Sequence, residues 1–303
     1  MMTLFGRAGA LALAGTLTAC AVPHPASEIS SGAQLAPATR VSHDLQHLPE
    51  PKGKVVVAVY GMRDQTGQYK PAPDSSFSTA VTQGAASLLI KALRDSGWFI
   101  PVERENLQDL LTERKIVRAL EVPAEKGAPA TQGVALPALM PASILVEGGV
   151  IAYESNVRTG GVGASYLGIG LFQQYRVDQV TVNLRSVDIR SGQILNSVST
   201  SKTIYSYELK PSVYKFVDFK DLLQIEVGHT RNEPAQLCVR EAIEAAVVHL
   251  TVQGIRERAW ALKNEADIKH PLIASYLREN DELRERVDEP PRAIERNTET
   301  GGP

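Results

Sequence analysis

The chain has 303 residues, of which 43% are hydrophobic and 22% charged, a composition typical of folded globular proteins. Its formal net charge is −2 and no basic run is interleaved with aromatic residues, so nothing in the sequence favours a nucleic-acid partner. The six histidines are dispersed, and the one close pair, His43 and His47, has no third ligand grouped with it, which argues against a metal site.

The first twenty residues have the layout of a secretory signal peptide. Arg7 precedes an apolar run over residues 8–17, and small residues precede Cys20. This run of about ten residues is too short to span a bilayer as a helix. The letters LTAC, which end at Cys20, resemble a bacterial lipobox, the signal for cleavage before a cysteine that receives a lipid. The alternative is an ordinary signal peptide with a chance cysteine. Because Ala21 rather than aspartate follows, the lipoprotein interpretation predicts the outer membrane.

The next part of the chain predicts an arm, a strand and a long loop. Residues 21–53 are rich in Pro, Ser and Ala, which predicts an extended arm rather than a domain. Residues 55–60 (VVVAVY) predict a buried strand. The polar residues 61–77 then form a connection that is longer than most, and such loops are usually functional or disordered.

Two helices with a short strand between them are predicted next. Ser78 can cap the first helix, which has apolar residues at helical spacing. These residues are Val81, Ala85, Leu88, Leu89 and Ala92. In the strand over residues 99–102, Pro101 favours the edge of a sheet. A second helix is predicted after Asn106, with its buried side formed by Leu107, Leu110 and Leu111.

The second half of the chain predicts more strands and a long helix. Residues 144–153 predict a strand that is interrupted at Gly148 and Gly149. Ser191 and Gly192 predict a hairpin turn between two further strands. After Pro234 the chain has the pattern of a helix, and the free Cys238 within it is expected to be a small buried residue without chemistry. The charge-rich end of the chain extends a helix over residues 272–287 and then predicts a disordered tail.

Two segments of this half, residues 153–184 and 199–233, contain several tyrosines in an imperfect alternation of apolar and polar positions, and the first segment is also rich in glycine. Each is long enough for a pair of membrane-spanning strands of about 9–11 residues. Four strands cannot close a barrel in lipid, so membrane insertion would require several subunits to pool their strands. The alternative is a pair of long β-hairpins on a soluble domain, because alternation is a weak signal for barrel strands.

The alternation changes parity near Asp178. Val177 lies on one parity, and Val180, Val182 and Leu184 lie on the other. A one-residue slip in a strand exchanges its two faces, so we expect a slip near Asp178, where a strand would leave lipid and enter a periplasmic sheet. No Ser/His/Asp or Cys/His grouping has a local catalytic motif, and the sequence therefore predicts no enzyme.

Eight stretches of specific sequence cover nearly the whole chain after the signal peptide: DLQHLP at 44–49, VVVAVYGMRDQTGQYKP at 55–71, FSTAV at 77–81, WFIPVER at 98–104, LLTERKI at 110–116, YESNVRTGGVGASYLGIG at 153–170, TSKTIYSYE at 200–208 and EVGHTRNEP at 226–234. Together they resemble the CsgG family of curli secretion channels. The resemblance implies an α+β fold, in which a periplasmic α/β domain carries two inserted transmembrane β-hairpins that form an oligomeric β-barrel. It implies a ring of about nine subunits and a barrel of about 36 strands.

Together with this resemblance, the sequence divides into eight segments. They are a signal peptide (1–19), a lipidated arm (20–53), the first part of the periplasmic domain (54–152) with a constriction loop (61–77), a first transmembrane hairpin (153–184), a periplasmic hairpin (185–198), a second transmembrane hairpin (199–233), a helical part of the periplasmic domain (234–276) and a charged tail (277–303).

The resemblance also implies the function and the site residues. The family exports unfolded curli major and minor subunits across the outer membrane without nucleotide hydrolysis, together with CsgE-like and CsgF-like accessory proteins. Its constriction is formed by a Tyr, an Asn and a Phe, and these positions fall on Ala72, Ser76 and Phe77, so one aromatic ring of residues is kept and the other is absent. Accessory-factor contacts are implied for four polar residues: Asn156, Asp178, Thr230 and Asn232. The lipid on Cys20 is the one covalent group expected, with no other cofactor and no metal. A second interpretation is a lipoprotein scaffold or regulator that forms no pore.

Overall fold

The computed structural model describes residues 35, 38–70, 77–120, 136–159, 174–210, 213–217 and 233–288. The chain divides into two compact units, Met1–Ala38 and Thr39–Pro303, and every helix and strand named below belongs to the second unit. The predicted signal peptide and the predicted lipid site Cys20 lie outside the described residues.

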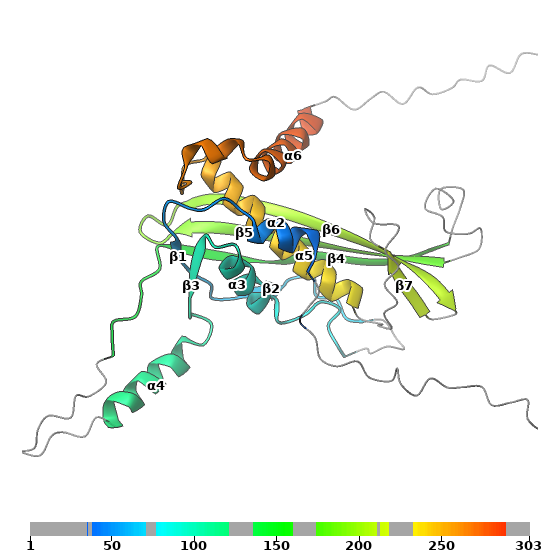
Figure 1. The fold of residues 1–303 in the computed structure, drawn as a ribbon. Helices are drawn as coiled ribbons and strands as arrows, with labels where there is room; N and C mark the ends of the chain where they lie inside the picture. Colours follow the sequence, from blue (N-terminus) through cyan, green and yellow to red (C-terminus); the bar gives the residue numbers. More distant parts are fainter. Residues whose placement is uncertain are drawn as a thin grey trace, which may run out of the picture. The chain divides into compact units, whose positions relative to one another are not determined.

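Among the described residues, seven strands form one mixed sheet, with β2 paired only to β4 and the others in the order β3-β1-β4-β5-β6-β7 (Figure 1). The strands are β1 (Val55–Ala58), β2 (Met62–Asp64), β3 (Phe99–Val102), β4 (Ile144–Thr159), β5 (Gln174–Asp188), β6 (Ile194–Lys210) and β7 (Val213–Val217). β1 is parallel to β3 and β4, and β4 to β7 form an antiparallel meander. The prediction of an α+β fold is confirmed, and so is the edge position of β3.

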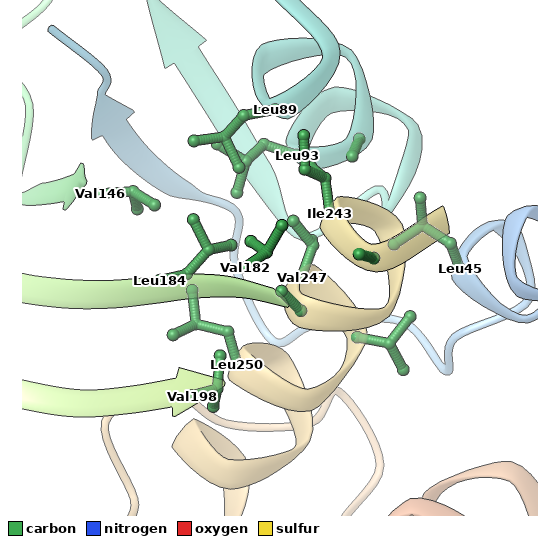
Figure 2. Packing of buried hydrophobic residues seen from close by; sticks show 14 of the residues in the cluster. Leu45, Leu89, Leu93, Val146, Val182, Leu184, Val198, Ile243, Val247 and Leu250 are labelled. Atoms are coloured by element: carbon green, nitrogen blue, oxygen red, sulfur yellow. The ribbon is translucent and has the colours of Figure 1, made fainter. Parts of the chain in front are cut away.

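Helix α3 (Ala85–Asp95) and helix α5 (Glu233–Arg256) pack against each other, and α5 also packs on β5 and β6. The core lies between these helices and the sheet, as Figure 2 shows. Its labelled side chains are Leu45, Leu89, Leu93, Val146, Val182, Leu184, Val198, Ile243, Val247 and Leu250. Cys238 of α5 is buried and free, as predicted, and burial raises the pKa of its thiol.

The start of α3 differs from the prediction. The helix begins at Ala85 with Gly84 at the N-cap position, whereas a cap at Ser78 was expected. Ser78 is instead part of a backbone pairing, because its carbonyl oxygen accepts a bond from the Lys70 N–H at 2.8 Å. Val81 lies before the helix but is buried. Its apolar side chain therefore serves the core from the segment before α3 and not from a position on the helix.

Helix α4 (Leu107–Leu120) forms where the second helix was predicted, but its expected buried side does not exist in the described residues. No residue of α4 is buried, and Leu107, Leu110 and Leu111 are only half-buried. The apolar spacing on α4 is therefore present although none of its residues is buried.

The sequence suggested that Gly148 and Gly149 interrupt a strand, and this prediction is wrong. β4 runs continuously through both residues, because each glycine allows a neighbouring strand to approach closely. A Cβ atom on Gly148 would lie 2.1 Å from the Asn183 carbonyl oxygen of β5. One on Gly149 would lie 2.9 Å from the Arg63 carbonyl oxygen of β2. The irregularity of β4 lies instead between Val150 and Ala152, where its register with β5 shifts.

Residues 21–53 are not wholly extended, because Arg40–Gln46 form helix α2. Thr39 and Ser42 make a capping box at its start, in which each side chain accepts the other's backbone N–H. The Ser42 hydroxyl also donates to Glu244 of α5 at 2.7 Å, and Leu45 is 1% exposed. The predicted arm is thus fixed to α5 at residues 39–46.

Two helical elements follow α5. A 3-10 helix, η2 (Glu265–Lys269), leads into helix α6 (Pro271–Asp288), which confirms the predicted helix over residues 272–287. The segment predicted as a charged tail from residue 277 therefore begins as helix, and residues 289–303 lie outside the described residues. The predicted turn between β5 and β6 is also confirmed, with Gly192 at a φ of 73° that favours glycine.

Candidate functional site

The predicted constriction loop is closed at its base by backbone pairing. Tyr69 and Thr79 form an isolated antiparallel bridge, the Lys70 N–H donates to the Ser78 carbonyl at 2.8 Å, and the Ala80 N–H donates to the Gln68 carbonyl at 2.9 Å. The loop predicted over 61–77 is therefore shorter than expected. Its first residues form β2, and the backbone bonds around residue 70 join its two ends. Ala72 and Ser76 lie outside the described residues.

Asp64 at the end of β2 organises the turn that leads into this loop. Its Oδ1 atom accepts bonds from the Thr66 N–H at 2.9 Å and from the Thr66 hydroxyl at 2.7 Å. Its Oδ2 atom accepts a bond from the Gln83 amide at 3.4 Å, which comes from the far side of the loop. The carboxylate thus links both ends of the segment and sets where the loop leaves the sheet.

Phe77 lies next to this pairing, and its side chain is 92% exposed. Tyr60 and Tyr69, which flank the same loop, are 62% and 61% exposed. The structure thus places the predicted Phe77 at an accessible position next to the backbone pairing that closes the loop.

β4, β5 and β6 are the longest strands, with 16, 15 and 17 residues. Their pairing is continuous from the helix-covered sheet to Thr159 and Gln174, and β6 continues to pair with β7. Residues 160–173, 211–212 and 218–232, which include the turns of the two predicted transmembrane hairpins, lie outside the described residues. The described strands therefore run from the core toward both hairpins without a break.

The predicted slip near Asp178 is wrong. Ser155 pairs with Asp178 and Asn156 with Val177 in one unbroken ladder, and the register shifts of β5 lie elsewhere, opposite Val150 and at Ser186. Alternation in β5 is maintained, so the face that carries Val180 also carries Asp178 and Arg176. The parity of the apolar residues changes at Asp178, where Cys238 of α5 lies against the backbone of β5.

At this junction Asp178 is buried, with 1% of its surface exposed. Its Oδ1 atom accepts a hydrogen bond from the Tyr153 hydroxyl at 3.0 Å and pairs with Arg176 Nε at 3.2 Å. Arg176 Nε also donates to the Ser155 hydroxyl oxygen at 2.7 Å. A buried carboxylate needs such partners, because an unpaired charge in the interior is very costly. The four side chains form a junction network that joins β4 to β5.

The N-terminal part of α5 contacts the strands at the junction network. The Cys238 thiol lies 3.7 Å from the Asp178 carbonyl oxygen, where it can donate a weak bond. One turn further along, Glu241 pairs with Lys202 of β6 at 2.6 Å, and only 7% of the Glu241 side chain is exposed. Helix α5 is thus connected to both β5 and β6 at the place where the strands leave its cover.

The four residues predicted to contact an accessory factor do not form one described patch. Asn156 is exposed, whereas the Asp178 carboxylate is buried and engaged in the junction network. The two lie on opposite faces of the sheet, because Asn156 pairs with Val177 rather than with Asp178. Thr230 and Asn232 lie outside the described residues. A contact by Asn156 stays a prediction, and Asp178 offers no accessible side chain for one.

Sequence reasoning missed Tyr153, Arg176 and Glu241 as partners at the junction. A signal was present for one of them, since Arg176 and Asp178 are two residues apart in a strand whose same face carries Val180 and Val182. Opposite charges on a face that is about to be buried are expected to pair. Tyr153 and Glu241 come from other elements, so only the tertiary structure identifies them.

The comparison with protein families decides the classification. A family model described as "Curli production assembly/transport component CsgG" matches residues 38–279. The chain belongs to the CsgG family. The protein of that description from Escherichia coli K12 is 48% identical over 277 residues, which cover 91% of this chain and 97% of the relative. The Salmonella typhimurium LT2 protein is 49% identical over 267 residues, with 88% and 93% covered. That of Citrobacter koseri is 50% identical over 243 residues, with 80% and 87% covered.

The matched range of the CsgG family contains the whole sheet, α2 to α5 and the junction network, and it ends within α6. The predicted family resemblance is thus confirmed. In the part of the chain that the structure describes, no helix combines the length and apolar character needed to cross a bilayer. The same residues contain no group of three or more His, Cys, Asp or Glu side chains placed to hold a metal ion.

Proposed function

We propose that this CsgG family member is one subunit of an oligomeric pore in the outer membrane that exports unfolded curli subunits from the periplasm to the cell surface. The relatives' description as curli assembly and transport components supports the cargo. Export of an unfolded chain requires a passage rather than a catalytic site. The proposal therefore includes no enzyme activity and no nucleotide hydrolysis in this chain.

The observation that carries this proposal is the continuity of β4, β5 and β6 beyond the cover of α5. A strand pair that only completed the core would end where the core ends, near Val180 and Tyr153, both of which are buried. Here the pairing continues past both residues to Thr159 and Gln174 on one side and to β7 on the other. Two hairpins that grow out of a folded sheet suit strands that pass from the periplasm into lipid.

This arrangement also explains why the pore would need several copies. In the part of the sheet that continues beyond the core, β4 lies at one side and β7 at the other. There each of these two strands has one edge without a partner in the described chain. Unpaired strand edges are not tolerated in hydrocarbon, because their backbone groups would lack hydrogen bonds. We infer that β7 of one subunit pairs with β4 of the next until the ring closes, in a number of subunits near the nine expected from the family.

The remaining predicted features fit the same proposal. A lipid on Cys20 would anchor the arm in the outer membrane, and α2 would connect this arm to α5. Asn156, which is exposed beside the junction, is the described candidate for contact with a CsgE-like or CsgF-like protein. In a ring, the accessible Phe77 side chains of all copies would form an apolar collar around the axis.

The decisive experiment is extraction of the outer membrane with mild detergent, followed by size analysis and single-channel recording in a planar bilayer. We expect a large oligomer with a steady conductance. A monomer without conductance would overturn the pore and would support a lipoprotein scaffold or regulator instead.

A tyrosine at position 72 tests the assignment of the constriction. Because the family has an aromatic residue where this chain has Ala72, we expect Ala72→Tyr to narrow the passage and to lower single-channel conductance by roughly twofold or more. Ser75→Tyr is the matched control, since it adds the same ring to the same loop at a position not assigned to the constriction. Equal conductance of Ala72→Tyr and the unmodified pore would show that the loop does not form the constriction.

A further inference from the structure

Helix α6 is held to the rest of the protein by few side chains. Among residues 271–283, whose burial is described, Ile273 and Tyr276 are buried, and Leu272 and Leu277 are partly buried. The helix contacts α5, and the Tyr276 hydroxyl donates to Asp44 Oδ2 of α2 at 3.1 Å. A helix with so small a buried surface can be released by a modest change at its contact, because local opening depends on how few contacts must be broken.

His249 of α5 lies directly under this contact and is 8% exposed. The imidazole ring of His249 and the ring of Tyr276 pack edge-to-face, with 4.8 Å between the ring centroids. In the described part of the chain, His249 Nδ1 is buried and has no hydrogen-bond partner. Its Nε2 atom lies 3.8 Å from Glu279 Oε2, which is beyond hydrogen-bond distance, and the Glu279 side chain is 60% exposed.

Protonation of His249 would be poorly compensated at this place. The imidazolium ion has two N–H donors, and its Nδ1–H would be buried without an acceptor. Burial therefore lowers the pKa of His249, and the attraction of Glu279 offsets this only in part. Because docking of α6 lowers the pKa of His249, neutral His249 favours the docked state and protonated His249 favours release of α6.

The other groups around His249 do not supply the missing acceptor. Asp44 of α2 already accepts the Tyr276 hydroxyl, and Asp281 of α6 already pairs with Arg256 Nη1 of α5 at 2.9 Å. Two further nitrogen atoms between α5 and α6, Arg256 Nη2 and Asn280 Nδ2, are also buried without an acceptor in the described residues. The contact between α5 and α6 is thus short of acceptors before any proton is added, and Arg40 near Tyr276 adds positive charge.

We propose that α6 is a pH-sensitive clasp, which is docked on α5 and α2 while His249 is neutral and is released when His249 is protonated. In the released state His249 reaches solvent and has its ordinary pKa of about 6.5. The ratio of released to docked protein therefore rises as pH falls below about 6.5, by at most about tenfold per pH unit for one proton. The rise ends at the lowered pKa of the docked state, because both states are protonated below it.

Release would break the bond between Tyr276 and Asp44 of α2, the helix that connects the predicted lipidated arm to the domain. Asn280 and Asp281 lie beyond the range that the family model matches, which ends at residue 279. The clasp thus uses side chains on both sides of that limit. It concerns α6 alone and does not depend on the proposed pore.

Hydrogen–deuterium exchange of the purified full chain in detergent tests the clasp. Exchange rates of backbone amides in residues 271–283 are measured at pH 8, 7, 6 and 5.5 and corrected for the intrinsic pH dependence of exchange. We expect protection to be constant from pH 8 to 7 and to fall below about pH 6.5, with a several-fold loss by pH 5.5. Constant protection over the whole range would overturn the proposal.

The variants assign the effect to one histidine. His249→Phe keeps a ring against Tyr276 without a titrating group, so protection of α6 is expected to be independent of pH. His249→Gln serves the same purpose if the phenylalanine variant does not fold. His270→Gln is the matched control, because the His270 Nδ1 atom accepts the Leu272 N–H at the start of α6 at 3.3 Å. We expect the control to keep the pH dependence. If His249→Phe and His249→Gln keep it, or if His270→Gln removes it, His249 is not the switch.

Discussion

Gly148→Ala is expected to destabilise the protein by about 3 kcal/mol, because the new methyl group has no space that a side chain can vacate. The Cβ atom would lie 2.1 Å from the Asn183 carbonyl oxygen and 2.8 Å from Leu184 Cδ2. The first obstacle is backbone of the neighbouring strand, so relief requires β4 and β5 to separate. Gly148 also pairs with Leu184 in the ladder that leads to the first hairpin, and separation would weaken this ladder.

Thermal unfolding of the purified protein in detergent, together with its steady-state level in the outer membrane, measures this effect. Gly53→Ala is a matched control, because nothing lies within 4 Å of the position where its Cβ would stand. We expect the control to unfold within a few degrees of the unmodified protein. If Gly148→Ala unfolded at the same temperature as Gly53→Ala, the close approach of β4 and β5 would not exist.

Asp178→Ala is expected to cost about 3 kcal/mol as well, since removal of one partner leaves the others of a buried network without compensation. Arg176 would lose its carboxylate, and the buried Tyr153 hydroxyl would lose its acceptor. Because the network joins β4 to β5 where both leave the cover of α5, we expect less assembled oligomer and less export of curli subunits. Asp178→Asn keeps the shape of the side chain and one acceptor oxygen, so its stability should lie between that of the unmodified protein and that of Asp178→Ala.

Asn156→Ala is the control for Asp178→Ala, because Asn156 is one pair further along the same ladder and is exposed. Substitutions at such surface positions are usually worth no more than about 0.5 kcal/mol. Unfolding temperature is measured on both variants, and binding of a CsgE-like protein is measured on Asp178→Ala. A fully stable Asp178→Ala protein that failed to bind the accessory protein would show that Asp178 is a contact residue rather than part of a structural network.

Local patterns in the sequence were sufficient for the elements whose signal is short-ranged. The turn at Ser191 and Gly192, the edge strand with Pro101 and the helix around Cys238 each depend on the conformational limits of a few neighbouring residues. Such limits act in any context, and all three predictions are confirmed. The family resemblance, which depends on long stretches of identical residues, is confirmed by the family match over residues 38–279.

Predictions about which face is covered were less successful, because cover is supplied by another part of the chain. The leucines of α4 have helical spacing, yet none of them is buried. Gly148 and Gly149 were interpreted as an interruption, although they permit close strand approach. The parity change near Asp178 was interpreted as a slip, although the ladder of β4 and β5 is unbroken there and Asp178 is buried in a polar network.

The sequence by itself determined most of the strands and helices, though not α2 or β2, together with the turn residues and the family, since these depend on local conformational preference and on residue identity. The tertiary structure alone decided that Asp178 is buried with Tyr153 and Arg176, and that His249 lies beneath Tyr276 without an acceptor for a second proton. Both outcomes depend on side chains from elements far apart in the chain. Their interaction energies exist only once α5 has packed on the sheet and α6 has packed on α5.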